Sequence, residues 1–541
     1  MQGTMLDAPL TLPQLFERAV ALFGRREIIS RSSDRSIRRY TYADAWRRCR
    51  ALAEALTRAG LAPGDRVATL MWNDSAHLEA YLGIPLAGAV LHTLNLRLPS
   101  AQIAWIVNDA SDRFLIVDET LLPLFETWRG ATALERVFVV RAQAGDGAAP
   151  LPAGCECYEA FIADTTGRFR APVPSENDAC GLCYTSGTEG NPKGVVYTHR
   201  SSVLHSLVLG LPDTLDISRW DTILPVVPMF HVNAWGIPYA AIMSGAKLVL
   251  PGRHLDPESL LELFEREQVT LTAGVPSIWL GLLQKLDREP SRWKLPRMRM
   301  IIGGSAAPES LIRGFDRHGQ EVIHAWGMTE TSPVGAVSRL KPGMEQLAED
   351  DRYAYRAKQG LAPPLVDVRI MGEDGPAEQD GKAFGELQVR GPWVTGSYFG
   401  AAQDTSRFTE DGWLRTGDVA TIDPEGYVKI VDRTKDLIKS GGEWISSCDL
   451  ENALMSHPAV LEACVIAVPN ATWGERPLAL VVFRESAQAT AEQLAAHIAP
   501  LFPKWWLPDG FVAVGELPKT SVGKLAKRVL RERYALWKPE N

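Results

Sequence analysis

Hydrophobic and polar positions in the first half of the chain alternate between two kinds of pattern. Stretches in which apolar residues recur every three to four positions indicate amphipathic helices, and short β-rich runs between them indicate strands. Helices are predicted over 43–59, 78–88 and 100–109, and strands over 66–71, 90–93 and 114–117. The same alternation resumes between residues 204 and 273. Strands that alternate with helices predict a parallel α/β sheet.

The pattern changes from about Leu365. Short strands separated by turn residues are predicted over 366–371, 385–390 and 427–431. Such a series predicts an antiparallel or barrel-like subdomain. A helix over 447–456, a strand over 463–468 and a helix over 491–499 follow, which is enough for a small separate α+β domain.

We therefore expect two domains. The first, over 1–432, combines parallel α/β subdomains with a small β-barrel-like subdomain. The second, over 433–541, is a small α+β domain. The length of 541 residues agrees, because it exceeds what one hydrophobic core usually organises.

Composition narrows the class of protein. Apolar residues make up 46% of the chain and charged residues 23%, as in an ordinary globular enzyme. The net charge of −8 argues against a general nucleic-acid binder. The N-terminus has no basic region followed by an apolar core, so no secretory signal is predicted. The apolar run Ala80–Leu91 contains Pro85 and is too short to span a bilayer, so no integral membrane segment is expected.

The seven cysteines are scattered along the chain. An odd and dispersed set fits a reducing cytoplasm better than a disulfide framework. Cys180 and Cys183 form a CxxC, but no second pair follows at zinc spacing and an apolar strand runs through them. We interpret them as buried structural thiols.

One stretch carries clear chemistry: residues 184–194 read YTSGTEGNPKG. Glycines allow the backbone to expose consecutive N–H groups, hydroxyl side chains add donors, and Lys193 adds a positive charge. This combination suits a polyphosphate. The stretch is not the GxxxxGK[ST] loop, because Pro192 precedes the lysine and no Ser or Thr follows it.

The stretch resembles the signature [YF]TSG[ST]TGxPKG of the adenylate-forming (AMP-binding) superfamily at ten of eleven positions. Further motifs of that superfamily follow in the expected order. They are GGSAAP at 303–308, WGMTE at 326–330, TGD at 416–418, DRTKDLIKSGGEWIS at 432–446 and LPKTSVGKLAKR at 517–528. Within the superfamily, PVVPMFHVNAWGIPYA at 225–240 is similar to bacterial medium- and long-chain fatty acyl-CoA synthetases.

The resemblance implies a two-step reaction. A fatty acid attacks the α-phosphate of MgATP, which gives an acyl-adenylate and pyrophosphate, and CoA then displaces AMP. ATP, Mg²⁺ and CoA are thus the implied cofactors or co-substrates. The first step needs charge neutralisation and in-line positioning rather than a protein nucleophile.

The resemblance also assigns candidate residues. Thr185 and Glu330 would lie near Mg²⁺, and Lys524 would neutralise charge during adenylation. His231 would lie beside the acyl-adenylate, and Trp235 would gate an apolar tunnel also lined by Gly304. The implied nucleotide-binding set is Thr185, Ser186, Gly187, Thr188, Glu189, Lys193, Gly304, Ser305, Trp326, Gly327, Thr329, Asp418, Arg433, Lys435, Lys439 and Trp444. The C-terminal domain would be mobile, with its hinge near Lys435.

Glu189 departs from the motif, because the family has a hydroxyl residue there. A carboxylate is repelled by phosphates and cannot donate the lost hydrogen bond. Three interpretations stay open: an engineered substitution that slows adenylation, a natural residue that points away and pairs with Lys193 or Arg200, or a chain that has lost ATP chemistry. The other motifs are intact, which argues against general decay.

Other functions also stay open. The chain could act on a short-chain, thio-substituted or aromatic acid, pass its acyl group to a carrier protein, or bind fatty acid with weakened catalysis. Analogy with related synthetases suggests a homodimer, with the apolar stretch from Leu10 to Phe23 as a candidate contact. Peripheral contact with a membrane is left open.

Overall fold

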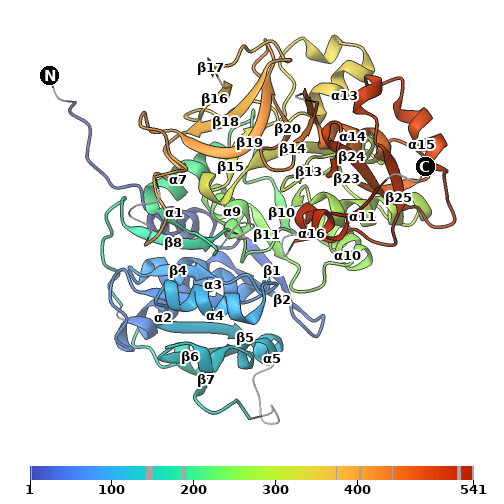
Figure 1. The fold of residues 1–541 in the computed structure, drawn as a ribbon. Helices are drawn as coiled ribbons and strands as arrows, with labels where there is room; N and C mark the ends of the chain where they lie inside the picture. The colour runs from blue at the N-terminus through green and yellow to red at the C-terminus, as the bar shows by residue number, and fades with distance from the viewer. Residues whose placement is uncertain are drawn as a thin grey trace.

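The computed structural model describes residues 1, 3–141, 150–167, 169–185, 191–372, 374–400, 405–441, 443–520 and 525–538. Four sheets organise these residues (Figure 1), and one of the two large sheets combines the first two strands of the chain with strands from its middle. Two large, mainly parallel sheets carry helices. A five-stranded antiparallel sheet comes next, and a C-terminal sheet ends the chain.

The first large sheet has the strand order β7-β6-β5-β3-β4-β8-β9, parallel except for the antiparallel pair β8–β9. Its strands are β3 (Arg66–Leu70), β4 (Val90–Thr93), β5 (Phe114–Asp118), β6 (Arg136–Val140), β7 (Cys155–Cys157), β8 (Ala179–Tyr184) and β9 (Gly194–Thr198). The phosphate-loop motif joins β8 to β9.

The second large sheet has the order β15-β14-β13-β12-β10-β11-β1-β2, with antiparallel strands at both edges. Its strands are β1 (Glu27–Arg31), β2 (Ile37–Thr41), β10 (Thr222–Pro225), β11 (Lys247–Leu250), β12 (Leu271–Gly274), β13 (Arg299–Ile302), β14 (Glu321–Gly327) and β15 (Val334–Val337). The motif at 303–308 directly follows β13. The motif at 326–330 begins in the last two residues of β14 and continues beyond them.

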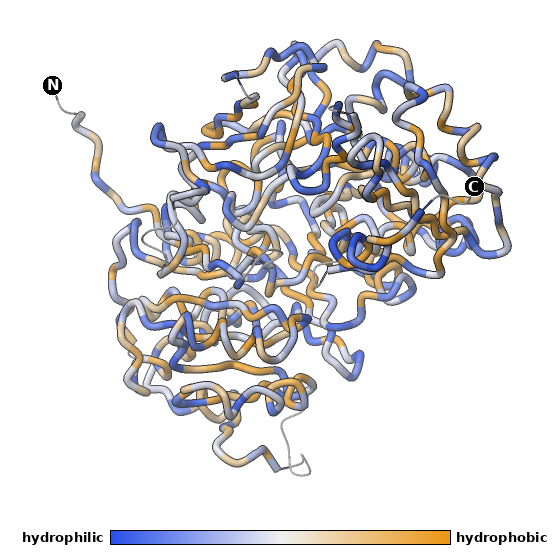
Figure 2. The backbone as a smooth tube through the Cα atoms, in the orientation of Figure 1, coloured by the Kyte–Doolittle hydropathy of each residue, from blue (hydrophilic) through white to orange (hydrophobic). Residues whose placement is uncertain are grey.

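The helices of the large domain cover these two sheets. They are α1 (Leu12–Phe23), α2 (Tyr42–Arg58), α3 (Ser75–Leu86), α4 (Ser100–Asp109), α5 (Leu122–Glu126), α6 (Tyr158–Ala163), α7 (His199–Leu209), α8 (Val232–Trp235), α9 (Ile237–Ser244), α10 (Pro257–Glu267), α11 (Pro276–Arg288), α12 (Glu309–Arg317) and α13 (Glu349–Ala357). Every residue of α3 is buried, as expected for a helix without a polar face. Hydrophobic segments run mainly through the interior, and the short terminal helix α16 (Lys527–Arg533) is strongly hydrophilic (Figure 2).

The antiparallel sheet has the order β17-β16-β18-β19-β20. Its strands are β16 (Asp367–Gly372), β17 (Gly375–Pro376), β18 (Phe384–Arg390), β19 (Leu414–Ile422) and β20 (Val428–Arg433). The C-terminal part contains β21 (Ile438–Ser440), β22 (Glu443–Ile445), β23 (Val460–Asn470), β24 (Gly474–Phe483) and β25 (Gly510–Ala513), with α14 (Ser447–Met455), α15 (Ala491–Ile498) and α16. The predicted fold class, α/β with an antiparallel subdomain and a smaller C-terminal unit, is confirmed.

Two further expectations can be compared with the structure. Cys180 and Cys183 are buried free thiols, as predicted. The apolar face of α1 is used inside the chain, because Leu12, Phe16 and Ala19 are buried in the main core. These three residues pack within their own chain, and the homodimer contact over the stretch from Leu10 to Phe23 stays a prediction. None of the described helices is long and apolar enough to cross a membrane.

Candidate functional site

The phosphate-loop motif begins and ends on the β8–β9 hairpin. The Thr185 amide donates to the Lys193 carbonyl oxygen at 2.9 Å, and the Lys193 amide donates to Thr185 Oγ1 at 3.1 Å. These two hydrogen bonds hold the ends of the motif together. Ser186, Gly187, Thr188 and Glu189 lie outside the described residues. One alternative partner of Glu189, Arg200, forms an ion pair with Glu176 at 2.8 Å.

Lys193 is linked to Glu330 through a residue that the sequence analysis missed. The Lys193 ammonium lies 4.8 Å from the ring centroid of Tyr398, and the Tyr398 hydroxyl donates to Glu330 Oε1 at 2.8 Å. Tyr398 belongs to the segment after β18, where Phe399 donates its amide to the Gly194 carbonyl oxygen at 2.8 Å. The candidate phosphate-binding and metal-binding residues therefore form one connected group.

Backbone contacts fix the WGMTE segment beside this group. The Tyr197 hydroxyl donates to the Thr329 carbonyl oxygen at 2.8 Å, which ties the segment to β9. A Cβ atom at Gly327 would lie 1.7 Å from the Pro333 carbonyl oxygen, so only glycine fits there. Glu330 is 4% exposed, and its carbonyl oxygen accepts from the Thr395 amide at 2.8 Å.

Trp326, Asp418 and Arg433 form the nucleotide side of the candidate site. The Trp326 indole N–H donates to Asp418 Oδ2 at 2.9 Å, and Arg433 Nε lies 3.6 Å from Asp418 Oδ1. Asp418 is 7% exposed. Thr416 holds the TGD turn, because its hydroxyl donates to the Leu387 carbonyl oxygen and accepts from the Asp418 amide. The structure thus brings together three predicted residues from two sheets.

An unusual backbone conformation shapes the His231–Trp235 segment. Val232, Asn233, Ala234 and Trp235 all have positive φ, between 46° and 59°, so α8 is a left-handed turn. This conformation costs L-residues about 1–2 kcal/mol each, and such strain is often found at functional sites. Surrounding contacts hold it in place: the Cys183 thiol donates to Asn233 Oδ1 at 3.3 Å.

The segment before this turn is also fixed. The Asn73 side chain donates to the carbonyl oxygens of Pro225 and Val227, and its Oδ1 accepts from the Met229 amide at 2.7 Å. Asn73 lies between β3 and α3, so it joins the two large sheets. The half-buried His231 comes two residues after Met229, and its amide donates to the Pro228 carbonyl oxygen at 3.0 Å.

Trp235 faces the GGSAAP segment. The side chain is 9% exposed, and a Cβ atom at Gly303 would lie 3.0 Å from its ring. Gly304 has φ of 85°, a conformation that favours glycine. Ser305 lies beside the buried His324, whose pKa is lowered by burial to about 4, so that imidazole is neutral near pH 7. Trp235 and the GGSAAP segment are therefore neighbours.

The C-terminal candidates lie beyond β20. Lys435 is exposed. Lys439 and Trp444 face each other in the β21–β22 hairpin, with the ammonium 4.9 Å from the indole centroid. The Lys439 amide donates to Glu475 Oε2 at 2.8 Å, so this pair is held by the C-terminal sheet. Lys524 lies outside the described residues.

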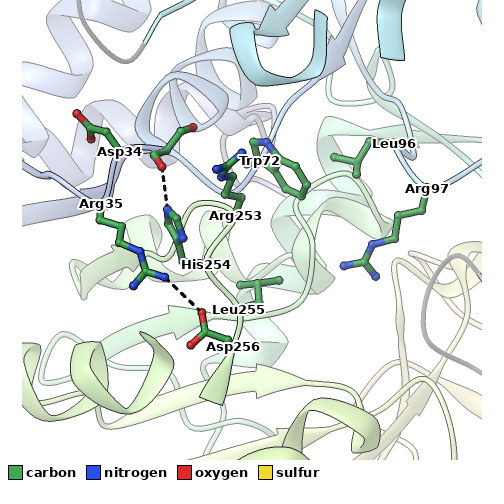
Figure 3. A pocket seen from close by; sticks show the side chains of 10 residues that line it. Asp34, Arg35, Trp72, Leu96, Arg97, Arg253, His254, Leu255 and Asp256 are labelled. Carbon is green, nitrogen blue, oxygen red and sulfur yellow. Dashed lines mark hydrogen bonds and ion pairs between the residues drawn. The ribbon is translucent and has the colours of Figure 1, made fainter. Parts of the chain in front are cut away.

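A separate cavity of about 800 Å³ opens at the carboxyl ends of the large sheets (Figure 3). It is lined by segments that follow β1, β3, β4 and β11, which is where α/β sheets commonly bind ligands. Its lining residues are Ser33, Asp34, Arg35, Trp72, Leu96, Arg97, Arg253, His254, Leu255 and Asp256. Three guanidinium groups and an indole ring line the cavity, and one of the guanidinium groups, that of Arg35, forms an ion pair with Asp256 at 3.9 Å.

Sequence reasoning missed Tyr398 and this cavity. Tyr398 stands in a loop, after Gly396 and Ser397 and before Phe399 and Gly400, without a spacing that marks it. The cavity residues come from four separate segments, so only the fold brings them together.

These candidate residues suit a nucleotide with phosphates beside an apolar segment. A model of the AMP-binding enzyme family matches residues 16–399, and a model of the AMP-binding enzyme C-terminal domain matches residues 449–524. The chain belongs to the AMP-binding enzyme family.

Several characterised relatives match nearly the whole chain. A long-chain-fatty-acid–CoA ligase of Thermus thermophilus is 51% identical over 98% of this chain and 97% of its own. A medium-chain-fatty-acid–CoA ligase of Ectopseudomonas oleovorans is 43% identical over 99% of this chain and 98% of its own. A 3-methylmercaptopropionyl-CoA ligase of Ruegeria pomeroyi is 44% identical over 99% of both chains. The crystal structure of ATP-bound MatB from Rhodopseudomonas palustris matches with a TM-score of 0.81 and 26% identity, over 98% of this chain and all of that one.

Proposed function

We propose that this enzyme is an AMP-forming CoA ligase for medium- to long-chain fatty acids. The connected group Lys193–Tyr398–Glu330, beside Trp326–Asp418–Arg433, is the observation that carries the proposal. Lys193 offers a cation and Glu330 a buried carboxylate, and Asp418 can accept hydrogen bonds from a ribose. The full-length similarity to two fatty-acid–CoA ligases supports the choice of acid.

In the adenylation step, the phosphates of ATP bind the 185–193 segment and Lys193. Trp326 packs against adenine, and Asp418 accepts hydrogen bonds from the ribose hydroxyls. Glu330 and the Thr185 hydroxyl fit Mg²⁺, which takes few protein oxygens and keeps several waters. A Mg²⁺ ion held by these two residues would supply positive charge to the phosphates of ATP.

The fatty acid lies on the other side of the α-phosphate. Its carboxylate is oriented beside His231, and its alkyl chain extends past Trp235. Lys524, on the C-terminal domain, neutralises the carboxylate and α-phosphate during this step. We place the domain boundary near residue 432 and the hinge at Lys435, so that the C-terminal domain can turn between the two steps and bring Lys439 and Trp444 to the nucleotide.

CoA acts in the second step. The cavity with Arg35, Arg97 and Arg253 suits its phosphate groups, and Trp72 offers a surface for its adenine. Arg253→Met should therefore raise the KM for CoA about tenfold, the loss of one charged hydrogen bond, with little change in pyrophosphate release. If Arg253 contacts the 3′-phosphate of CoA, the same substitution should raise the KM for dephospho-CoA, which lacks that phosphate, by less.

Glu189 bears on the rate of the first step. A carboxylate in the phosphate-binding segment weakens ATP binding, so Glu189→Thr should raise kcat or lower the KM for ATP. If neither changes, Glu189 does not impair adenylation.

A second candidate substrate is a thio-substituted acid, because the Ruegeria relative is named for 3-methylmercaptopropionate. A screen of acyl-CoA formation with octanoate, palmitate, butyrate, benzoate and 3-methylmercaptopropionate separates the candidates. Highest kcat/KM for octanoate or palmitate supports the fatty-acid proposal, and highest kcat/KM for the thioether acid overturns it. A cytoplasmic homodimer is the proposed setting.

A further inference from the structure

Tyr398 touches two charged residues of opposite sign. Its ring face lies 4.8 Å from the Lys193 ammonium, a cation–π distance. Its hydroxyl lies 2.8 Å from Glu330 Oε1. The side chain is 5% exposed, so both contacts are sheltered from water.

The hydroxyl can act only as a donor to Glu330. The carboxylate oxygen of Glu330 is an acceptor and the phenol carries the proton, so the hydrogen bond runs from Tyr398 to Glu330. A hydrogen bond to an ionised carboxylate is stronger than one between neutral groups. It fixes Oε1 and thereby the rotation of the carboxylate, which sets the direction of Oε2.

A third charged residue joins this tyrosine to the ribose side. The Arg407 guanidinium lies within electrostatic reach of Tyr398, and a Cβ atom at Gly417 would lie 3.0 Å from it. The Arg407 carbonyl oxygen accepts from the Arg415 amide at 2.8 Å, which anchors it to β19. Tyr398 therefore stands between the phosphate side and the TGD turn.

A lysine and a glutamate in one buried site attract each other strongly, because the local dielectric constant is low. A direct pair would draw the ammonium from phosphate and the carboxylate from metal. The tyrosine gives each its own contact, the ring face for the cation and the hydroxyl for the anion.

We propose that Tyr398 is a positioning residue that orients Glu330 toward Mg²⁺ through its hydroxyl and holds Lys193 for the phosphates through its ring. This inference rests on the proposed roles of Glu330 and Lys193. It adds a residue outside every motif that the sequence analysis used.

Tyr398→Phe tests the hydroxyl alone, because the ring remains for Lys193. The matched control is Tyr158→Phe, since the Tyr158 hydroxyl also donates to a buried carboxylate, Glu79 Oε2, at 2.9 Å, but between the helices α6 and α3, away from the site. The readout is the Mg²⁺ concentration that half-saturates binding of a non-hydrolysable ATP analogue, measured by thermal shift.

Tyr398→Phe should raise that Mg²⁺ concentration about tenfold or more, the loss of one hydrogen bond to a charged group. Tyr158→Phe should leave it unchanged. Saturating Mg²⁺ should restore most of kcat in Tyr398→Phe, whereas Tyr398→Leu, which also removes the ring, should keep a raised KM for ATP. In a Glu330→Gln background, Tyr398→Phe should add no further shift.

An unchanged Mg²⁺ dependence in Tyr398→Phe, or an equal shift in Tyr158→Phe, would overturn the inference. If Tyr398→Phe is too unstable to assay, Glu330→Asp moves the carboxylate away from the hydroxyl and should show the same shift. The binding readout does not require turnover. A parent that binds the analogue with Mg²⁺ but activates no fatty acid contradicts the proposed function alone, and binding that is independent of Mg²⁺ contradicts the inference.

Discussion

At the nucleotide end of the candidate site, side chains from separate elements are joined by polar contacts, whereas the apolar end is shaped by backbone. Trp326 reaches Asp418 through a hydrogen bond, and Tyr398 reaches Glu330 in the same way. Trp235, in contrast, is positioned by a left-handed turn and by close packing on Gly303. Removing one charge at the nucleotide end should therefore lower activity or ATP binding. At the apolar end, changes in side-chain size or backbone conformation should alter stability or the preference for acids of a given length.

The largest effect is expected from Glu330→Gln, which removes the buried charge that we assign to Mg²⁺. Pyrophosphate release should fall about 10²–10³-fold, as when one preorganised electrostatic group is lost. Glu378→Gln, on an exposed residue, is the control. Activity within a few fold of the parent in Glu330→Gln would remove Glu330 from the account.

The second-largest effect is expected from Asp418→Asn, which should weaken the binding of ATP. The change removes the charge that accepts from Trp326 and lies near Arg433, and that we expect to bind ribose. The KM for ATP should rise about tenfold to a hundredfold, the range for one charge-assisted hydrogen bond. Asp367→Asn, on an exposed ion pair of the same sheet, should leave the KM unchanged. Equal effects from the two variants would contradict the assignment.

Gly236→Ala tests the backbone of the apolar end. Gly236 has φ of 70°, and a Cβ atom there would lie 2.7 Å from His205 Nδ1. The substitution should lower the free energy of unfolding by about 1–3 kcal/mol, measured by denaturant titration. Gly130→Ala is the control, because its Cβ atom would meet nothing within 4 Å. A parent-like stability in Gly236→Ala would mean that the turn is not strained.

Trp235→Ala should give the smallest and most selective effect. Removing the indole opens space along the proposed alkyl path, so longer acids should gain relative to shorter ones, by about fourfold per methylene that becomes buried. The ratio of kcat/KM for palmitate and octanoate measures this change. Trp220→Ala, on a residue that is 84% exposed, is the control. An unchanged ratio would place the alkyl chain elsewhere.

The sequence predicted the sheet framework closely where periodicity was strong. The strand over 90–93 and the helix over 100–109 have the same bounds in the structure as in the prediction. The nucleotide side was predicted through motif resemblance. The hydrogen bond between Trp326 and Asp418 was not, because these residues are far apart in the chain and on different sheets.

The turn at Val232–Trp235 could not be predicted, because Val, Asn, Ala and Trp rarely adopt four consecutive positive φ angles. Only the surrounding fold imposes that conformation. The apolar stretch from Leu10 to Phe23 was considered as a dimer contact by analogy with related synthetases. In the structure, Leu12, Phe16 and Ala19 of this stretch belong to the main core of their own chain.

The most direct test of the central claim is pyrophosphate release with octanoate, decanoate and palmitate at saturating MgATP, with and without CoA. The account predicts release that depends on chain length, on CoA for sustained turnover, and on Glu330. If neither the parent nor Glu189→Thr releases pyrophosphate with any of these acids, the proposed function is contradicted.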